Sequence, residues 1–197
     1  MKRTYKVAGH KFAVVMPDHN LAWNEMSSCE PFVCEDADEC LFTAELLDAM
    51  PDTSGKQKVT VGCEGPDMPR VELFEWNGEW LMELAPTLEA PVRAYLITDK
   101  AFSKGRFRLL GSMRFSLSTV LMRMFAFATA RKNTLLMHAS VTMKDGKGYV
   151  FLGKSGTGKS THSQLWINNI GGCSLLNDDN PVIRVMEDGL ADRKSVV

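Results

Sequence analysis

The sequence predicts a mixed α and β fold (α+β or α/β) in two parts: a β-rich region over residues 1–112, then a helix and an α/β core over residues 113–197. Three observations support this division. Short runs of β-branched and aromatic residues, separated by turn residues, fill the first part. A long apolar stretch with helical periodicity follows at about residue 116. Beyond it, an apolar run leads into a glycine-rich loop and a second helical pattern.

The composition is that of an ordinary globular protein without a strong charge field. Of the 197 residues, 45% are hydrophobic and 24% are charged, and the formal net charge is -1. A chain of this length can bury a core as one large domain or two small ones. No basic field is present to recruit nucleic acid, no apolar run approaches the ~20 residues of a membrane span, and the N-terminus does not read as a signal peptide. We therefore expect a cytoplasmic protein that binds neither nucleic acid nor membrane.

Two clusters of potential metal ligands lack the spacing that metal sites require. Cys29, Cys34 and Cys40 fit no zinc pattern, and no histidine lies among them. The carboxylates of residues 35–39 lack the spacing and the glycine of a calcium loop. We expect the five cysteines, which include Cys63 and Cys173, to be reduced structural thiols, and the acidic stretch to be a solvated loop.

The region before residue 113 is predicted to be mostly antiparallel β structure with no residues arranged for chemistry. Its clearest signal is a hairpin of residues 71–76 and 79–84, because Asn77-Gly78 accepts the positive φ values of a type I′ turn. Residues 23–50 show no clear pattern. The remaining expected strands are residues 4–7, 12–16, 58–61, 92–98 and 107–110.

A helix of about four turns is predicted over residues 117–132. Ser116 is expected to cap its start, and Arg131 and Lys132 suit the negative end of the helix dipole. Apolar residues occupy most of its circumference, so we expect it to be buried between the β region and the core that follows. Its methionine and phenylalanine side chains are expected to pack in the interior.

Residues 153–160 match the phosphate-binding loop pattern G-x-x-x-x-G-K-[ST] without a mismatch. The apolar run of residues 149–152 predicts a strand before the loop. Residues 161–170 predict a helix after it, and their apolar side chains Leu165, Trp166 and Ile170 are spaced to share one face. Strand, loop and helix in this order are the context that the motif requires.

The residue types in this loop suit a nucleotide. Glycines allow positive φ, so that successive N–H groups and the helix N-terminus can converge on phosphate oxygens. Lys159 is expected to reach the β- and γ-phosphates of ATP or another phosphoryl donor, and Ser160 to ligate Mg²⁺. The expected phosphate-binding residues are Gly153, Ser155, Gly156, Thr157, Gly158, Lys159, Ser160 and Thr161.

Phosphoryl transfer also needs a carboxylate at the end of a neighbouring strand, to hold Mg²⁺ or to take a proton from the acceptor hydroxyl. Asp178 and Asp179 follow an apolar pair and lie after the loop in the chain. Since neighbouring side chains on a strand point to opposite faces, at most one of them is aimed directly at the γ-phosphate. Pro181 is expected to end or offset this strand, and residues 182–186 to continue it.

His138 is a further candidate. It lies near the C-terminal half of the strand that is expected to pair with the strand of the loop, which can place it beside the same carboxylate. A packed histidine without a catalytic role is the alternative.

Residues 136–140, 148–161 and 175–179 together resemble the catalytic core of HPr kinase/phosphorylase, which shares the nucleotide-binding architecture of phosphoenolpyruvate carboxykinase. The resemblance covers roughly residues 134–186. It implies an ATP-dependent phosphotransferase that moves the γ-phosphoryl to a hydroxyl of a protein, peptide or small molecule, and that tends to form homo-oligomers. It further implies Asp178 as the base, His138 as the partner of Asp178, and Asp179 as a secondary metal or structural carboxylate.

This chain differs from that family in two respects. Thr161 stands where the HPr-specific enzymes carry a glutamate, which argues against HPr itself as the acceptor. The chain ends about forty residues after the loop, so we expect the core to be incomplete at its C-terminus. A nucleotide-binding module or fragment without turnover is therefore the alternative function. A transporter-type ATPase is disfavoured, because no Leu-Ser-Gly-Gly-Gln segment follows the loop.

Overall fold

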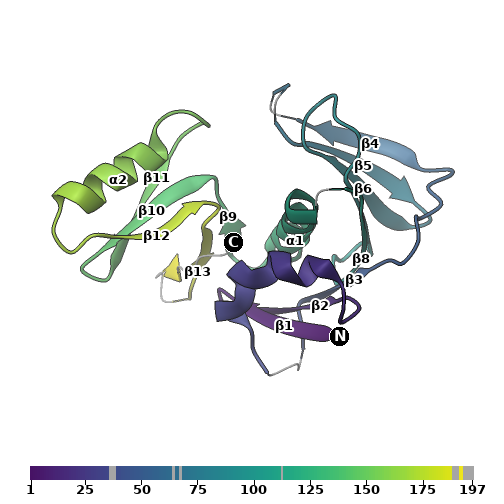
Figure 1. The fold of residues 1–197 in the computed structure, drawn as a ribbon, viewed down its shortest axis with the longest axis horizontal. Coiled ribbons are helices and arrows are strands. Elements are labelled where there is room, and N and C mark those ends of the chain that lie inside the picture. Colours follow the sequence, from purple (N-terminus) through teal and green to yellow (C-terminus); the bar gives the residue numbers. More distant parts are fainter. Residues whose placement is uncertain (36–38, 64, 67, 112, 188–190, 193–197) are drawn as a thin grey trace. The chain divides into compact units, whose positions relative to one another are not determined.

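The structure is a computed structural model that describes residues 1–35, 39–63, 65–66, 68–111, 113–187 and 191–192. It is mixed α and β, as predicted, and divides into two compact units (Figure 1). The first unit contains Met1–Lys6 and His10–Ala128, and the second contains Val7–Gly9 and the chain from Thr129 onward. The boundary predicted at residue 113 and the observed division thus lie at opposite ends of the same helix. No helix among the described residues has the length and apolar character needed to cross a membrane.

The first unit is built on an eight-stranded mixed sheet in the order β1-β2-β3-β8-β7-β6-β5-β4. The strands from β8 to β4 pair antiparallel, as the sequence predicts, whereas β3 pairs parallel to both β2 and β8. The eight strands are β1 (Lys2–Val7), β2 (His10–Val15), β3 (Phe42–Leu46), β4 (Gln57–Gly62), β5 (Arg70–Trp76), β6 (Glu79–Ala85), β7 (Ala94–Thr98) and β8 (Lys104–Leu109).

The parallel pairing of β2 with β3 explains why residues 23–50 show no clear pattern in the sequence. Parallel neighbours need a crossover connection of a dozen residues or more. Here that connection contains the 3₁₀ helix η1 (Leu21–Phe32), which has Pro31 within it. The acidic stretch after it includes residues 36–38, which lie outside the described residues.

The predicted hairpin of β5 and β6 is confirmed. Asn77 and Gly78 connect the two strands with φ values of 49° and 77°, the left-handed region that a type I′ turn requires at both central positions. An asparagine tolerates this region and a glycine adopts it freely, so the two-residue turn fixes the register of the hairpin.

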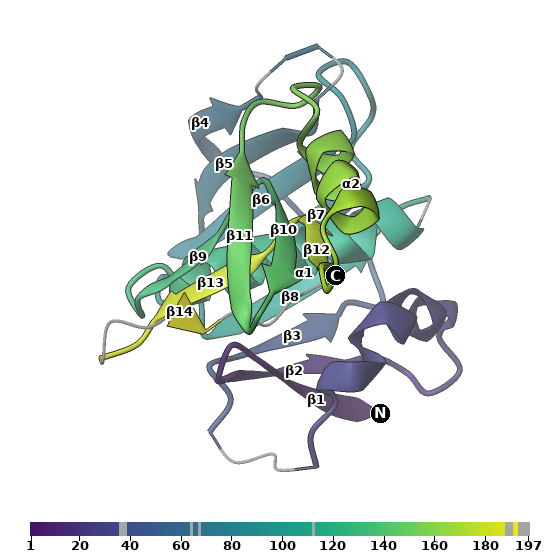
Figure 2. The ribbon, with the colours of Figure 1, turned by 90° about the vertical axis from the view of Figure 1, so that its left-hand side faces the viewer.

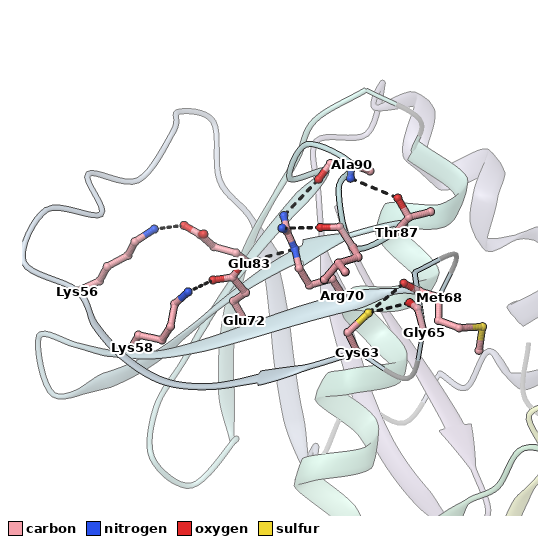
Figure 3. A network of polar contacts seen from close by, with 11 residues as sticks. Lys56, Lys58, Cys63, Gly65, Met68, Arg70, Glu72, Glu83, Thr87 and Ala90 are labelled. Atoms are coloured by element: carbon pink, nitrogen blue, oxygen red, sulfur yellow. Dashed lines mark hydrogen bonds and ion pairs between the residues drawn. The ribbon is translucent and has the colours of Figure 1, made fainter.

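A polar network crosses the neighbouring strands β4, β5 and β6 (Figure 3). Glu72 and Glu83 stand directly opposite each other on β5 and β6. Two like charges in this position repel each other. Lys56 pairs with Glu83, and Lys58 lies 2.6 Å from Glu72, where its hydrogen bond holds the pKa of that carboxyl below its usual range. The lysines therefore neutralise a cross-strand repulsion, which is a structural role.

Helix α1 (Met113–Thr129) supplies the other half of the core of this unit. Its Phe125 ring meets the rings of Phe12 and Phe42 edge-on, at centroid distances of 5.9 and 6.5 Å. Phe127 differs from the prediction, because it is 43% exposed and stacks on Phe102. Ser116 does not cap the helix start, since the helix begins three residues earlier and the Ser116 hydroxyl donates to the Arg93 carbonyl.

The second unit has two small antiparallel sheets and one described helix, and the order of strands is β11-β10-β12 in the first and β14-β13-β9 in the second (Figure 2). Helix α2 (Lys159–Asn169) packs against the first sheet (Figures 1 and 2). The strands are β9 (Thr134–Leu136), β10 (Ala139–Lys144), β11 (Lys147–Leu152), β12 (Ser174–Asp179), β13 (Val182–Val185) and β14 (Ala191–Asp192).

Two segments of this unit, residues 134–144 and 174–185, each contribute a strand to both sheets, and they pass from one sheet to the other at positions that pair with each other. The strand expected to pair with the strand of the loop is divided into β9 and β10, and Pro181 separates β12 from β13. The register is nevertheless continuous: Ala139 stands opposite Asp179, Leu136 stands opposite Val182, and between them the Met137 N–H donates to the Pro181 carbonyl. The interruption expected at Pro181 is therefore present, and the segment that pairs with it is interrupted at Met137 and His138 as well.

Removal of the Phe12 ring tests the core of the first unit. The ring is buried and also stacks on Phe42 at 5.0 Å, so we expect Phe12→Ala to lower the free energy of unfolding by about 3–5 kcal/mol. Urea denaturation measures this loss. Leu21→Ala is the control, because that side chain is 66% exposed and its removal is expected to change stability by less than ~0.5 kcal/mol. Equal losses in the two variants would contradict the packing described.

Candidate functional site

The glycine-rich loop connects β11 directly to α2, so strand, loop and helix occur in the predicted order. Gly156 and Gly158 have φ values of 79° and 88°, and nothing lies within 4 Å of the position that a Cβ would take on either residue. Such backbone, with open space beside it, allows N–H groups to approach an anion closely. Gly158 is also the N-cap of α2, so the positive end of the helix dipole faces the loop.

Lys159 is held within the loop. Its Nζ donates to the carbonyl oxygens of Gly153 and Lys154 at 3.0 and 3.1 Å. The Thr157 hydroxyl donates to the same Lys154 carbonyl at 2.8 Å. These bonds fold the loop back on itself and leave the ammonium group beside the loop backbone, where an anion bound by the N–H groups would meet it.

Asp178 is the carboxylate that faces the loop. The Ser160 hydroxyl, in the first turn of α2, donates to Oδ1 of Asp178 at 3.0 Å. The register explains this contact: Asp178 stands opposite Ser140, directly opposed residues of an antiparallel pair lie on one face of the sheet, and α2 covers that face. Both Ser160 and Asp178 are exposed to solvent.

Asp179 contacts His138 instead of the loop. Oδ1 of Asp179 lies 3.3 Å from Nδ1 of His138, and both side chains are largely exposed, at 64% and 46%. The Asn180 side-chain amide donates to the other carboxylate oxygen of Asp179 at 2.8 Å. Asp179 has a φ of 97°, in a region that non-glycine residues rarely adopt, so the backbone departs from strand geometry where this pair forms.

The structure therefore separates residues that the resemblance joins. His138 was expected beside Asp178, but it contacts Asp179, while Asp178 bonds to Ser160. His138 also does not lie in the C-terminal half of a strand, because it directly precedes β10 at the point where the segment changes sheets. There the strand geometry is interrupted, which no local sequence pattern signals.

The contacts that hold α2 on the sheet also differ from the prediction. Leu165 is 53% exposed and does not share a buried face with Trp166. The Trp166 ring instead lies 5.0 Å from Tyr149 and 5.3 Å from Phe151, both on β11. The buried residue of α2 is Ser163, whose hydroxyl lies 2.5 Å from that of Ser140.

The sequence reasoning missed Ser140, Ser163 and Asn180 as parts of this arrangement. A weak signal for the second serine was available, since residues three apart on a helix lie on one side and Ser163 follows Ser160 at that spacing. Nothing in the sequence indicates the partner of either serine.

The site offers an open cluster of donors for a phosphate and one hydroxyl–carboxylate pair for a cation. Within the part of the chain that the structure describes, no three His, Cys, Asp or Glu side chains are grouped to hold a metal ion. Mg²⁺ at a phosphate site needs no such cage, because it keeps several waters and takes one or two carboxylates together with phosphate oxygens. The hydroxyl oxygen of Ser160 and the carboxylate of Asp178 are the kinds of ligand that a protein contributes to such a Mg²⁺ ion.

Comparisons with protein-family models, curated proteins and solved structures found no match to this chain.

The loop geometry predicts a specific coupling between positions 153 and 157. A Cβ on Gly153 would lie 2.5 Å from the Thr157 hydroxyl oxygen, so Gly153→Ala must displace that side chain and break its bond to Lys154. We expect Gly153→Ala to destabilise the second unit by about 1 kcal/mol or more, and by clearly less in a Thr157→Ala background. Thermal unfolding of the four variants of this double-mutant cycle measures the coupling. Strictly additive losses would contradict the loop conformation.

Proposed function

We propose that this chain is an ATP-dependent phosphotransferase that moves a γ-phosphoryl group to a hydroxyl of a protein, peptide or small molecule. One observation carries the proposal. The loop fits the phosphate-binding pattern at every position, and the carboxylate of Asp178 accepts a hydrogen bond from Ser160 of that loop. The resemblance to the HPr kinase/phosphorylase core supports the same reaction class. We also propose that the protein is cytoplasmic and that its cysteines are reduced.

In this function the loop binds the phosphates. The backbone N–H groups around Gly156 and Gly158 and the N-terminus of α2 would contact the phosphate oxygens. Lys159 would exchange its bonds to the loop carbonyls for bonds to the β- and γ-phosphates, which are stronger because both partners are charged. The positive charge then neutralises the phosphates where charge develops during transfer.

Ser160 and Asp178 would hold Mg²⁺. A cation between them would replace the hydrogen bond that they share, and it would bring its own positive charge to the β- and γ-phosphate oxygens. This assignment differs from the one implied by the resemblance, which makes Asp178 the base.

The His138–Asp179 pair would take the proton of the acceptor. As the acceptor oxygen forms its bond to the γ-phosphorus, the bond from that phosphorus to the bridging oxygen breaks and ADP leaves with the electron pair. The hydroxyl proton passes to the imidazole Nε2 of His138, while Asp179 orients the ring through Nδ1 and stabilises the imidazolium. The exposure of both side chains leaves room for an acceptor as large as a protein.

A nucleotide-binding module without turnover is the second candidate, and one observation favours it. Residues 153–158, Ser160, Asp178 and His138 are all exposed, so no described element of the second unit excludes water from a phosphate bound there. The two candidates differ in one measurable quantity: a phosphotransferase consumes bound ATP when an acceptor is supplied, and a binding module does not.

Lys159→Ala tests the phosphate site. We expect it to weaken ATP binding by about 10- to 100-fold, the value of a hydrogen bond between charged groups, and to leave adenosine binding unchanged. Calorimetric titration with each ligand measures the two affinities. Lys154→Ala removes the same charge from the same loop and is the matched control, with an expected change of less than ~3-fold. Equal ATP affinities of Lys159→Ala and Lys154→Ala would contradict the assignment, whereas a uniform loss for ATP and adenosine would indicate misfolding.

The pair Asp178→Asn and Asp179→Asn tests the division of roles. We expect Asp178→Asn to raise the Mg²⁺ concentration needed for half-maximal ATP binding by roughly 10-fold or more. We expect Asp179→Asn to lower turnover by about 10²-fold with Mg²⁺-ATP binding unchanged, in line with general acid–base contributions. Titration of Mg²⁺ and assays of ATP consumption distinguish the two. The reverse pattern would support the assignment that the resemblance implies.

A further inference from the structure

We propose that the hydrogen bond between Ser140 and Ser163 is a positioning element of the phosphate site. It sets how closely α2 approaches β10, and thereby the distance between Ser160 and Asp178. This inference rests on the proposed function, because it assigns a role within the same Mg²⁺ site. The two serines are positioning residues, since neither is placed to touch nucleotide or cation.

The burial of this pair is the first argument. Ser140 and Ser163 are 0% and 1% exposed, and their hydroxyl oxygens lie 2.5 Å apart. Burying a hydroxyl is unfavourable unless it is hydrogen-bonded, so each serine requires the other. No apolar residue of α2 is buried to this extent. The contact of α2 with β10 is therefore a polar pair, whereas the aromatic contacts of Trp166 are with β11.

The connectivity of the pair is the second argument. Ser163 is three residues after Ser160, one helical turn along the same side of α2. Ser140 stands directly opposite Asp178 in the ladder between β10 and β12. The four residues thus form a closed frame. The helix turn, the ladder and the buried bond fix three of its sides, and the fourth side is the 3.0 Å contact between Ser160 and Asp178.

The fourth side is the part of the frame that solvent reaches and that a cation would enter. Removal of either buried hydroxyl leaves the other without a partner in a site closed to water. The helix must then move, or the frame must open to admit a water molecule. Either response changes the separation of Ser160 and Asp178, and Mg²⁺ tolerates little departure from its short, near-octahedral oxygen distances.

A merely structural role for the pair makes a different prediction. Loss of packing would lower the unfolding temperature and leave the effect of Mg²⁺ on ATP binding as it is in the wild type. Thr142 offers a matched control: it lies on the same face of β10, it is fully buried, and its hydroxyl has no hydrogen-bond partner. Thr142→Val therefore removes a buried hydroxyl beside α2 without breaking a bond.

The experiment measures the affinity for ATP in excess Mg²⁺ and in EDTA, on the intact chain. The variants are Ser163→Ala, Ser140→Ala, the double variant and Thr142→Val. We expect Mg²⁺ to tighten ATP binding to the wild type and to Thr142→Val. In Ser163→Ala and Ser140→Ala this tightening should fall by roughly 10- to 100-fold, as for other residues that orient metal ligands, while the affinity in EDTA stays within about 2-fold.

The outcomes separate this inference from the proposed function. If the wild type binds Mg²⁺-ATP and both serine variants keep the full tightening, the positioning role is wrong and the proposed function stands. If the wild type binds no ATP, both are overturned. Ser140→Ala carries the test if Ser163→Ala fails to fold, because it removes the other end of the same bond. The double variant should lose no more of the tightening than either single variant, since the bond is already absent in each.

Discussion

The candidate site depends on the pairing of β10 with both of its neighbours. On one side, Ala139 of β10 pairs with Leu152, the last residue before the glycine-rich loop. On the other side, Ser140 pairs with Asp178. Since a register shift of one residue would turn every side chain to the opposite face, this double pairing decides which carboxylate faces α2. The loop and its carboxylate come from strands that do not pair with each other, because β10 lies between β11 and β12.

Local signals in the sequence were sufficient for much of the fold. The turn residues Asn77-Gly78 predicted the hairpin of β5 and β6, and the spacing of glycines and Lys159 predicted a loop between strand and helix, because turn chemistry acts over a few residues. Long-range pairing has no such signature. The parallel position of β3 beside β2 and β8, and the division of residues 135–143 between two sheets, both depend on partners distant in the chain.

Single contacts in the site were also not predictable where they depend on partners distant in the chain. Alternation along a strand predicted that at most one of Asp178 and Asp179 is aimed at the γ-phosphate; in the structure Asp178 contacts Ser160 and Asp179 contacts His138. Which partner each has could not be predicted, because it depends on the register of β12 and on the interruption of the strand next to His138. The buried Ser140–Ser163 pair was invisible for a related reason: a serine in a helix is usually solvated, and only the tertiary structure shows that this one is not.

Whether the loop binds nucleotide phosphates is the central claim, and the thermal unfolding of the intact chain with Mg²⁺-ATP tests it most directly. A ligand at a hundred times its dissociation constant stabilises the folded state by ~2.7 kcal/mol. For a chain of this size we therefore predict a rise in the unfolding temperature of roughly 5–10 °C, with no comparable rise from Mg²⁺ or adenosine alone. An unchanged unfolding temperature at millimolar Mg²⁺-ATP would contradict the account.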